Sequence, residues 1–275
     1  MYLQVKPHPA LAPYVRLYRV LHFDFTASSH PIPHKPYPPR PETCLSFYPR
    51  DPETIAYPGD DRMGGFRASL YGKQSLVTNR YVGRDFLLIQ VVFHPTGLFR
   101  LTGIPAHSLT NAYVDAEGVF GKEIVALNTR LSGIADARAM LPHIEACLMG
   151  WVQRAKKSPH PLDTVSGLML QPQAGHRLDW LARESCLSPK QFERQFLQRI
   201  GLTPKSFARI VRFDRAFRLK NAQPGLDWLS IALQCGYYDY QHLAKDYKAF
   251  TNQTPTAFYE QDTQAPERHF GIQET

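Results

Sequence analysis

The chain has 275 residues, 43% of them hydrophobic and 20% charged, a composition that can bury cores and excludes a disordered or low-complexity protein. Lys and Arg number 32 against 24 Asp and Glu, a net charge of +8 that favours polyanionic partners without selecting one. The longest apolar run, residues 86–93, is too short for a membrane span, and the amino terminus lacks a signal-peptide pattern. At roughly 150 residues per domain, we expect a cytoplasmic protein of two domains with no membrane partner.

The first half combines strand-forming stretches with proline-rich turns. Residues 30–41 hold many prolines and are expected to form a loop or an edge strand, never a helix. After His94-Pro95 the apolar residues change to helical spacing. These patterns predict an α+β fold that begins with a small antiparallel sandwich or barrel. The expected strands are residues 14–21, 43–48 and 85–94, and the expected helices are residues 98–104, 120–131 and 137–154.

An apolar stripe on the last of these helices bears on assembly. Leu141, Ile144, Leu148 and Trp151 recur at steps of three, four and three residues, so one helix face is apolar. The stripe packs either on the sheet of its own domain or on a second copy of the chain, and amphipathicity alone does not choose. We hypothesise a homodimer through this helix.

The β-rich half is also rich in aromatic residues. Such residues either line a ligand pocket or form an ordinary core, and the sequence does not identify an effector. The aromatic residues in question are Phe47, Tyr48, Tyr57, Phe66, Tyr71 and Phe93.

Two basic residues and two prolines at residues 156–161 interrupt the helical pattern and are typical of a linker. We therefore divide the chain into a sensor or assembly domain (1–157), an all-α domain (158–262) and a tail (263–275).

The second half contains an internal repeat. Leu181-Ala182 recurs fifty residues later as Ile231-Ala232. In each copy a short helix is followed by a tight turn and by a second helix, which begins after a capping residue, Ser188 or Asp239. This is the plan of a helix-turn-helix unit, present twice. The expected helices are residues 178–185 and 189–200 in the first unit, and residues 227–234 and 239–250 in the second.

The two units differ at the turn and are joined by one long helix. Gly236 suits a turn that needs positive φ, whereas the first unit has Cys186 at that place. Either that turn holds Cys in a strained conformation, or its geometry is altered. Residues 204–221 are predicted to form the connecting helix, which can place the second helices in successive major-groove turns about 34 Å apart.

This second half resembles the AraC/XylS-type bacterial transcription regulators. The resemblance rests on residues 178–182, 188–196, 201–204, 212–219, 231–237 and 250–255. It covers roughly residues 161–262, and a weaker similarity links residues 91–99 and 115–121 to uncharacterised sensor-like domains of such regulators. The resemblance implies a DNA-binding activator with double-stranded DNA, a small-molecule effector, RNA polymerase and a second copy of the chain as partners.

The resemblance also implies which residues read bases, namely the early outward residues of each second helix. Their chemistry agrees, because Arg and Lys donate to guanine, Gln pairs with adenine, and a Tyr ring contacts a thymine methyl. A solvated helix face is the alternative for each of them. The candidates are Lys190, Gln191 and Arg194 in the first unit, and Tyr240, Gln241 and Lys245 in the second.

The sequence also bears on two other classes of function. A DNA-alkylation repair enzyme needs an activated thiolate, and Cys44 has no cysteine cluster around it. The chain shows no C-x-x-C or His-x-His pair and no Gly-rich phosphate loop, so we expect no enzyme, no catalytic residue, no metal and no cofactor. A constitutive or partner-controlled DNA-binding protein without a ligand remains the second alternative.

Charge is unevenly divided between the units. Residues 177–220 carry a balance of +7, whereas residues 221–262 carry −3. Because phosphate neutralisation supplies most non-specific affinity, the first unit and the connecting helix are expected to anchor the protein on DNA. The alternative is that the acids of the second unit face away from DNA.

Overall fold

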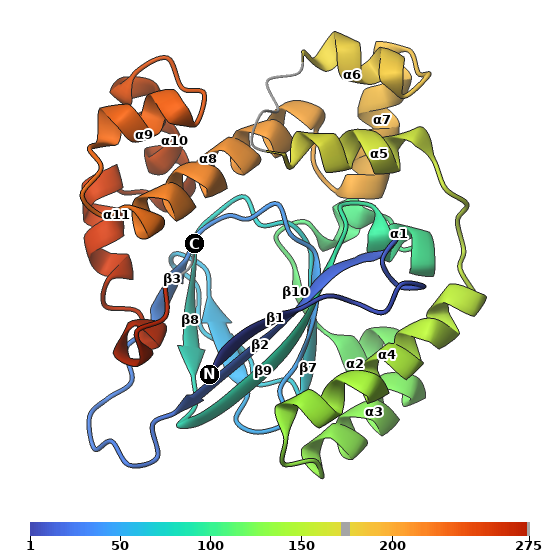
Figure 1. Ribbon diagram of the computed structural model, residues 1–275, viewed down its shortest axis with the longest axis vertical. Helices are drawn as coiled ribbons and strands as arrows, with labels where there is room; N and C mark the ends of the chain where they lie inside the picture. Colours follow the sequence, from blue (N-terminus) through green and yellow to red (C-terminus); the bar gives the residue numbers. More distant parts are fainter. Residues whose placement is uncertain (172–176, 274–275) are drawn as a thin grey trace.

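The computed structural model describes residues 1–171 and 177–273. Two β-sheets with flanking helices form the first part, and a set of helices lies across one end of them (Figure 1). This confirms the predicted α+β class. The strands are β1 (Tyr2–Val5), β2 (Val15–Asp24), β3 (Lys35–Tyr37), β4 (Cys44–Phe47), β5 (Glu53–Ala56), β6 (Met63–Gly64), β7 (Ala68–Tyr71), β8 (Thr78–Val82), β9 (Asp85–Phe93) and β10 (Tyr113–Asp115).

Across the described ranges these strands form two antiparallel sheets. The six-stranded sheet has the order β1-β2-β9-β4-β7-β10, and the four-stranded sheet has the order β3-β8-β5-β6. In the first sheet β2 pairs with β9 from Val15 to Asp24. The short strand β3 contains Pro36 and lies at a sheet edge, where a missing N–H need not break the ladder. The proline-rich residues 30–41 thus include the predicted edge strand.

The apolar stripe of α4 is buried inside its own domain. Ile144 and Leu148 are at most 1% exposed, and they share one core cluster with strand residues such as Val20 and Ile89. The stripe is therefore not available to a partner, and the hypothesis of a homodimer through it is wrong. The helical elements of this part are α1 (Gly97–Thr102), η1 (Ala106–Leu109), α2 (Ala116–Phe120), α3 (Lys122–Ser132) and α4 (Ala137–Gln153).

The second part has a hydrophobic core of its own. Its cluster runs from Leu162 to Phe258, and residues 154–160, which precede it, form neither helix nor strand. No helix within the described ranges is long and apolar enough to cross a bilayer. The elements are α5 (Pro161–Met169), α6 (Leu178–Glu184), α7 (Pro189–Ile200), α8 (Pro204–Ala222), α9 (Trp228–Gln234), α10 (Tyr240–Thr251), α11 (Pro255–Asp262) and η2 (Pro266–Phe270).

The turns of the two helix-turn-helix units have the same backbone geometry. Cys186 has φ of 53° and Gly236 has φ of 83°. In each turn the next residue donates its N–H to the carbonyl of the alanine in the first helix: Leu187 to Ala182 at 3.1 Å, and Tyr237 to Ala232 at 2.9 Å. The first turn therefore holds Cys in a left-handed conformation that favours glycine.

Cys186→Gly is expected to raise the free energy of unfolding by about 0.5–1 kcal/mol, because relief of left-handed strain exceeds the entropy cost of glycine. Gly236→Ala is the matched change, and it should lower stability by about 1 kcal/mol. Its effect is a backbone effect, since a Cβ at Gly236 would meet no atom within 4 Å. Urea denaturation of both variants checks this, and a less stable Cys186→Gly protein would contradict it.

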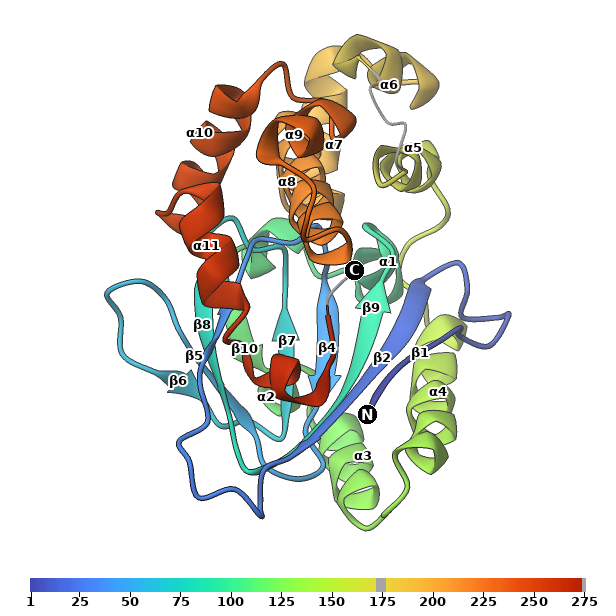
Figure 2. The same ribbon diagram turned by 60° about the vertical axis from the view of Figure 1, so that its left-hand side comes forward.

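Both helix-turn-helix units rest on the β domain (Figure 2). At the end of α7, Thr110 Oγ1 donates to the carbonyl of Gly201 at 2.5 Å. Gly201 has φ of 94°, and a Cβ there would lie 2.8 Å from the carbonyl oxygen of Ala106. Glycine is therefore favoured both by the backbone conformation and by the lack of space for a side chain. At the end of α10, the N–H of Val77 donates to the carbonyl of Phe250 at 2.9 Å. The two units are thereby held at separate points of the same domain.

Candidate nucleic-acid interface and inner cavity

The second helix of each unit begins with a side-chain cap. Ser188 accepts from the N–H of Gln191 at the start of α7, and Pro189 occupies the first helical turn. Asp239 accepts from the N–H of His242 at the start of α10, at 2.7 Å. Both helices have 12 residues and end at a left-handed residue, Gly201 or Asn252. The repeat in the sequence is thus a repeat in structure.

The structure places the six candidate base-reading residues as follows. Lys190, Gln191 and Arg194 are exposed on α7, and Gln241 and Lys245 are exposed on α10. Tyr240 is half-buried and packs on the core of the helical part. The side-chain oxygen of Gln191 accepts from the N–H and hydroxyl of Ser188, at 3.1 and 3.0 Å. Since paired recognition of adenine uses both ends of the amide, Gln191 as folded offers only its NH₂ group.

Helix α8 sets the spacing of the two units. Its 19 residues make a rod of about 28 Å at 1.5 Å per residue, comparable with one turn of B-DNA. One side is buried through Phe207, Ile210 and Phe213. The first unit lies at one end of this rod and the second unit at the other (Figure 1).

A buried carboxylate, which the sequence analysis counted only as a negative charge, joins α8 to α10. Asp246 is 2% exposed. It accepts from Arg209 Nε at 2.6 Å, from Arg212 Nη2 at 3.1 Å and from the Tyr237 hydroxyl at 3.1 Å. The Arg212 guanidinium also lies 4.2 Å from the centre of the Tyr237 ring. The second unit is therefore held together by a charge cluster that only the three-dimensional contacts reveal.

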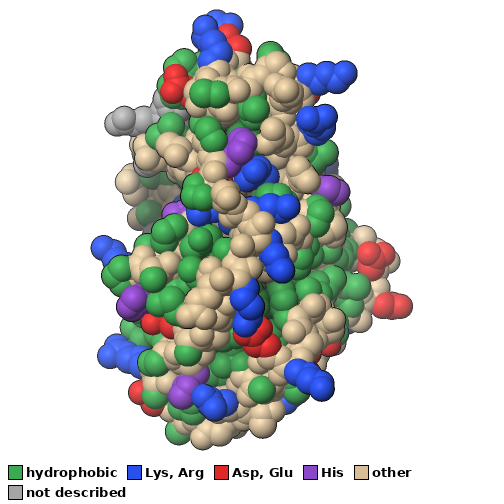
Figure 3. Space-filling model, turned by 90° about the vertical axis from the view of Figure 1, so that its right-hand side faces the viewer, with side chains coloured by type: hydrophobic (Ala, Val, Ile, Leu, Met, Phe, Trp, Pro, Cys, Tyr) green, Lys and Arg blue, Asp and Glu red, His purple; other side chains and the backbone are tan. Residues whose placement is uncertain are grey.

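Most acidic residues of the second unit either cap a helix or form a buried ion pair. Asp227 and Asp239 cap helices, while Asp246 and Asp262 are buried in ion pairs. Exposed cations remain on both units, with more on the first. On α6–α8 they are Arg183, Lys190, Arg194 and Lys205, and on α10 they are Lys245 and Lys248. Basic side chains are spread over the upper part of the face shown in Figure 3, which carries the first unit.

Tyr238 is a candidate contact residue that the sequence analysis missed. It is 89% exposed in the turn before α10, and its ring stacks on His242 with centroids 5.9 Å apart. The Nε2 atom of His242 lies 3.1 Å from Arg212 Nη2 and must accept there, because arginine only donates. A large aromatic residue next to a helix cap is the signal that could have identified it.

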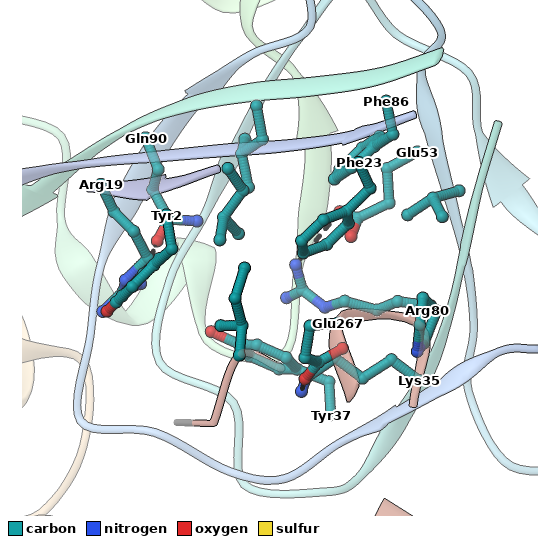
Figure 4. Close-up of a pocket in the computed structure, with 15 residues that line it drawn as sticks. Tyr2, Arg19, Phe23, Lys35, Tyr37, Glu53, Arg80, Phe86, Gln90 and Glu267 are labelled. Atoms are coloured by element: carbon teal, nitrogen blue, oxygen red, sulfur yellow. Dashed lines mark hydrogen bonds and ion pairs between the residues drawn. The ribbon is translucent and has the colours of Figure 1, made fainter. Parts of the chain in front are cut away.

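A small cavity of about 50 Å³ lies between the two sheets. Its charged residues are paired with neighbours: Arg19 with Glu42 at 3.1 Å, and Arg80 with Glu53 at 3.1 Å. Figure 4 shows Lys35 and Glu267 together on one side of it. None of the six aromatic residues singled out in the sequence is among its lining residues; the lining aromatics are Tyr2, Phe23, Tyr37 and Phe86.

Two family matches cover most of the described chain. Residues 181–261 match the family described as "Helix-turn-helix domain", and residues 3–115 match a "Domain of unknown function" (DUF6597). The first match spans both units and α8. The carboxy-terminal part is an AraC-type helix-turn-helix domain.

A regulator with a curated sequence matches a third of the chain. An "Uncharacterized HTH-type transcriptional regulator" of Haemophilus influenzae is 34% identical over 92 residues, which make up 33% of this chain and 30% of that relative's length. The chain thus spans less than a third of the relative it matches.

Solved structures align over longer stretches of the chain. ToxT from Vibrio cholerae aligns with 89% of this chain and 98% of its own, at 9% identity and a TM-score of 0.48. The AraC-like transcriptional activator CuxR aligns with 73% of each chain, at 13% identity and a TM-score of 0.25.

Proposed function

We propose that this chain is a sequence-specific DNA-binding transcription regulator whose AraC-type domain binds a bipartite site. The observation that supports it is the pair of capped 12-residue helices, each with exposed basic residues, joined by the rigid helix α8. Helices of this kind enter successive major grooves.

The proposed base contacts come from both second helices. Arg194 and Lys190 suit guanine, and Gln241 suits adenine, while Gln191 contributes through its free amide NH₂ group. Tyr238, at 89% exposure, joins this set as a further contact. The remaining proposed contacts are Tyr240 and Lys245.

The amino-terminal domain is proposed as a sensor for a small-molecule effector, bound between the two sheets. The buried charged groups that line the cavity there support this role, because small-molecule sites place few polar groups among apolar ones. The proposal has three further parts. The protein activates transcription through RNA polymerase, it forms a homodimer through a surface other than the α4 stripe, and it is located in the cytoplasm.

Arg194→Ala is expected to weaken binding to the preferred duplex by about 1–3 kcal/mol and to relax base preference at one position. The preferred duplex is first selected from a random pool, and affinities are then measured by mobility shift. Arg183→Ala is the control, because it removes an exposed cation from α6 without touching α7. Uniform weakening by Arg194→Ala on every sequence would contradict base reading and make Arg194 a phosphate contact.

Scrambling the half-site bound by the second unit should cost less affinity than scrambling the first, and it should leave most of the salt dependence intact. The reason is that more exposed cations lie on α6–α8 than on α10, and salt dependence follows the number of neutralised phosphates. Salt titration on the two scrambled duplexes measures this. Equal losses would show that both units dock alike.

A further inference from the structure

The chain after α11 folds back onto the β domain. Helix η2 places Pro266 and Glu267 among the residues that line the cavity, together with Ile272. Glu267 is 5% exposed, and Ile272 packs on the cluster that contains Phe23 and Phe86. Pro266, Glu267 and Ile272 of the predicted tail therefore form part of the cavity wall, as Figure 4 shows for Glu267.

The segment makes contacts of the kind a bound ligand makes: Glu267 reaches into the cavity, while Phe270, which is 38% exposed and not a lining residue, covers Phe23 from outside. The Phe270 ring stacks on Phe23, with centroids 5.2 Å apart and planes 15° apart. It also meets Phe25 edge to face at 5.0 Å. The Glu267 carboxylate forms an ion pair with Lys35 Nζ. The segment thus places an apolar ring on an aromatic surface and a carboxylate on a cation.

Lys35 connects the cavity with the helical part. Asp262, at the end of α11, lies 3.8 Å from Lys35 Nζ, so the carboxylates of Asp262 and Glu267 both reach Lys35 from the carboxy-terminal segment. By contrast, Arg19 and Arg80 have their acidic partners on the β domain. Burial lowers the pKa of Lys35 to about 7, although Asp262 acts in the opposite direction.

The segment leaves little room beside it. A cavity of about 50 Å³ holds a few water molecules, whereas sites for small organic ligands are several times larger. Entry of such a ligand therefore requires that the segment move out.

Resting on the sensor role proposed above, we propose that residues 266–272 are an intramolecular ligand of this cavity, and that they and an apolar organic anion exclude each other. The anion would take the place of Glu267 on Lys35 and of Phe270 on Phe23. Because the segment continues directly from α11, ligand entry also releases the end of α11 from Lys35. By linkage, binding in the cavity and docking of the segment oppose each other equally.

The test uses the full chain and anilinonaphthalene sulfonate, an apolar aromatic anion that fluoresces when bound. Phe270→Ala and Glu267→Gln each weaken docking, so the dye should bind at least about fivefold more tightly than to the unchanged protein. Trypsin should also cut after Arg268 at least about fivefold faster, because the docked segment holds Arg268 in hydrogen bonds to Asp262 and Asn221 and release of the segment exposes the backbone to cleavage. The matched control is Gln273→Ala, because Gln273 is exposed and lies directly after the segment.

A peptide of residues 263–275, added in trans to Phe270→Ala, should displace the dye. Displacement separates a vacated cavity from a partly unfolded variant, whose dye binding the peptide would not reverse. Unchanged dye affinity and cleavage in both variants, or dye that the peptide cannot displace, would overturn the inference. Mobility shift of the unchanged protein is measured in parallel: no specific binding to any duplex from the random pool, with the dye and trypsin results as expected, would overturn the proposed function instead.

Discussion

Asp246→Ala is expected to lower the free energy of unfolding by about 3 kcal/mol. The carboxylate is 2% exposed and accepts hydrogen bonds from Arg209, Arg212 and Tyr237. Its removal leaves two guanidinium groups and a buried hydroxyl without their partner, and breaking a buried ion pair from one side typically costs 3–5 kcal/mol. We expect the lower end of this energy range because the Arg209 and Arg212 side chains are 40% and 26% exposed and so remain partly hydrated.

The same change should reduce recognition of the second half-site more than that of the first. The cluster ties α10 to α8, so α10 loses its fixed position while α7 keeps its own cap and core. Urea denaturation and mobility shift on half-site variants measure the two effects. Glu260→Ala is the control, since Glu260 is exposed on α11. A loss below about 1 kcal/mol for Asp246→Ala would show that the cluster is not a main support of the unit.

Lys73→Met is expected to change how stability depends on pH. Lys73 is 1% exposed. Its Nζ donates to Thr43 Oγ1 at 3.0 Å and to the carbonyl of Pro95 at 3.3 Å. Within the described ranges no carboxylate lies within ion-pair distance of it, and burial lowers its pKa to about 7. Burial of the charged ammonium group therefore lowers the stability of the folded chain. Methionine has a similar length and no charge, so it avoids this cost.

The direction of the pH dependence follows from the number of protons that the folded and unfolded chains bind. Between pH 7 and 9 the unfolded chain holds the Lys73 proton, whereas the folded chain has largely released it. Stability of the unchanged protein should therefore rise with pH in this window, by roughly 1 kcal/mol per pH unit from this residue. Buried Cys44, whose pKa is raised to about 12, opposes the rise above about pH 9 in both proteins.

At pH 7 the Lys73→Met protein should be more stable by about 2–3 kcal/mol, after the loss of two hydrogen bonds is counted. This advantage should shrink by about 2 kcal/mol by pH 9. Urea denaturation at several pH values measures both. Lys122→Met, on the exposed start of α3, is the control and should give the pH dependence of the unchanged chain. Parallel curves for Lys73→Met and the unchanged protein would show that Lys73 is not the source of the slope.

Strands were harder to predict than helices, for a physical reason. β2, β4 and β9 are continuous apolar or alternating stretches and were expected. β8, with the sequence TNRYV, was not, because its Arg80 points inward to Glu53 and breaks the apolar alternation. Short strands that carry buried charges into a cavity do not differ from loops in sequence.

Features that depend on neighbouring residues could be predicted from the sequence. The caps Ser188 and Asp239, the left-handed helix end at Gly201, and the two-fold repeat all lie within a few residues of the backbone groups they serve. Local hydrogen bonding therefore sufficed to place α7, α8 and α10, and with them the six candidate contact residues.

The pairing of distant side chains could not be predicted and is seen only in the folded chain. Asp246 meets Arg209 across 37 positions, and Lys35 meets Glu267 across 232. The α4 stripe packs on the sheet of its own domain, and the segment of residues 266–272 lines one side of the cavity. The reason is physical: whether a charge faces solvent, DNA or a buried partner depends on which surfaces the folded chain brings together, and periodicity does not contain that information.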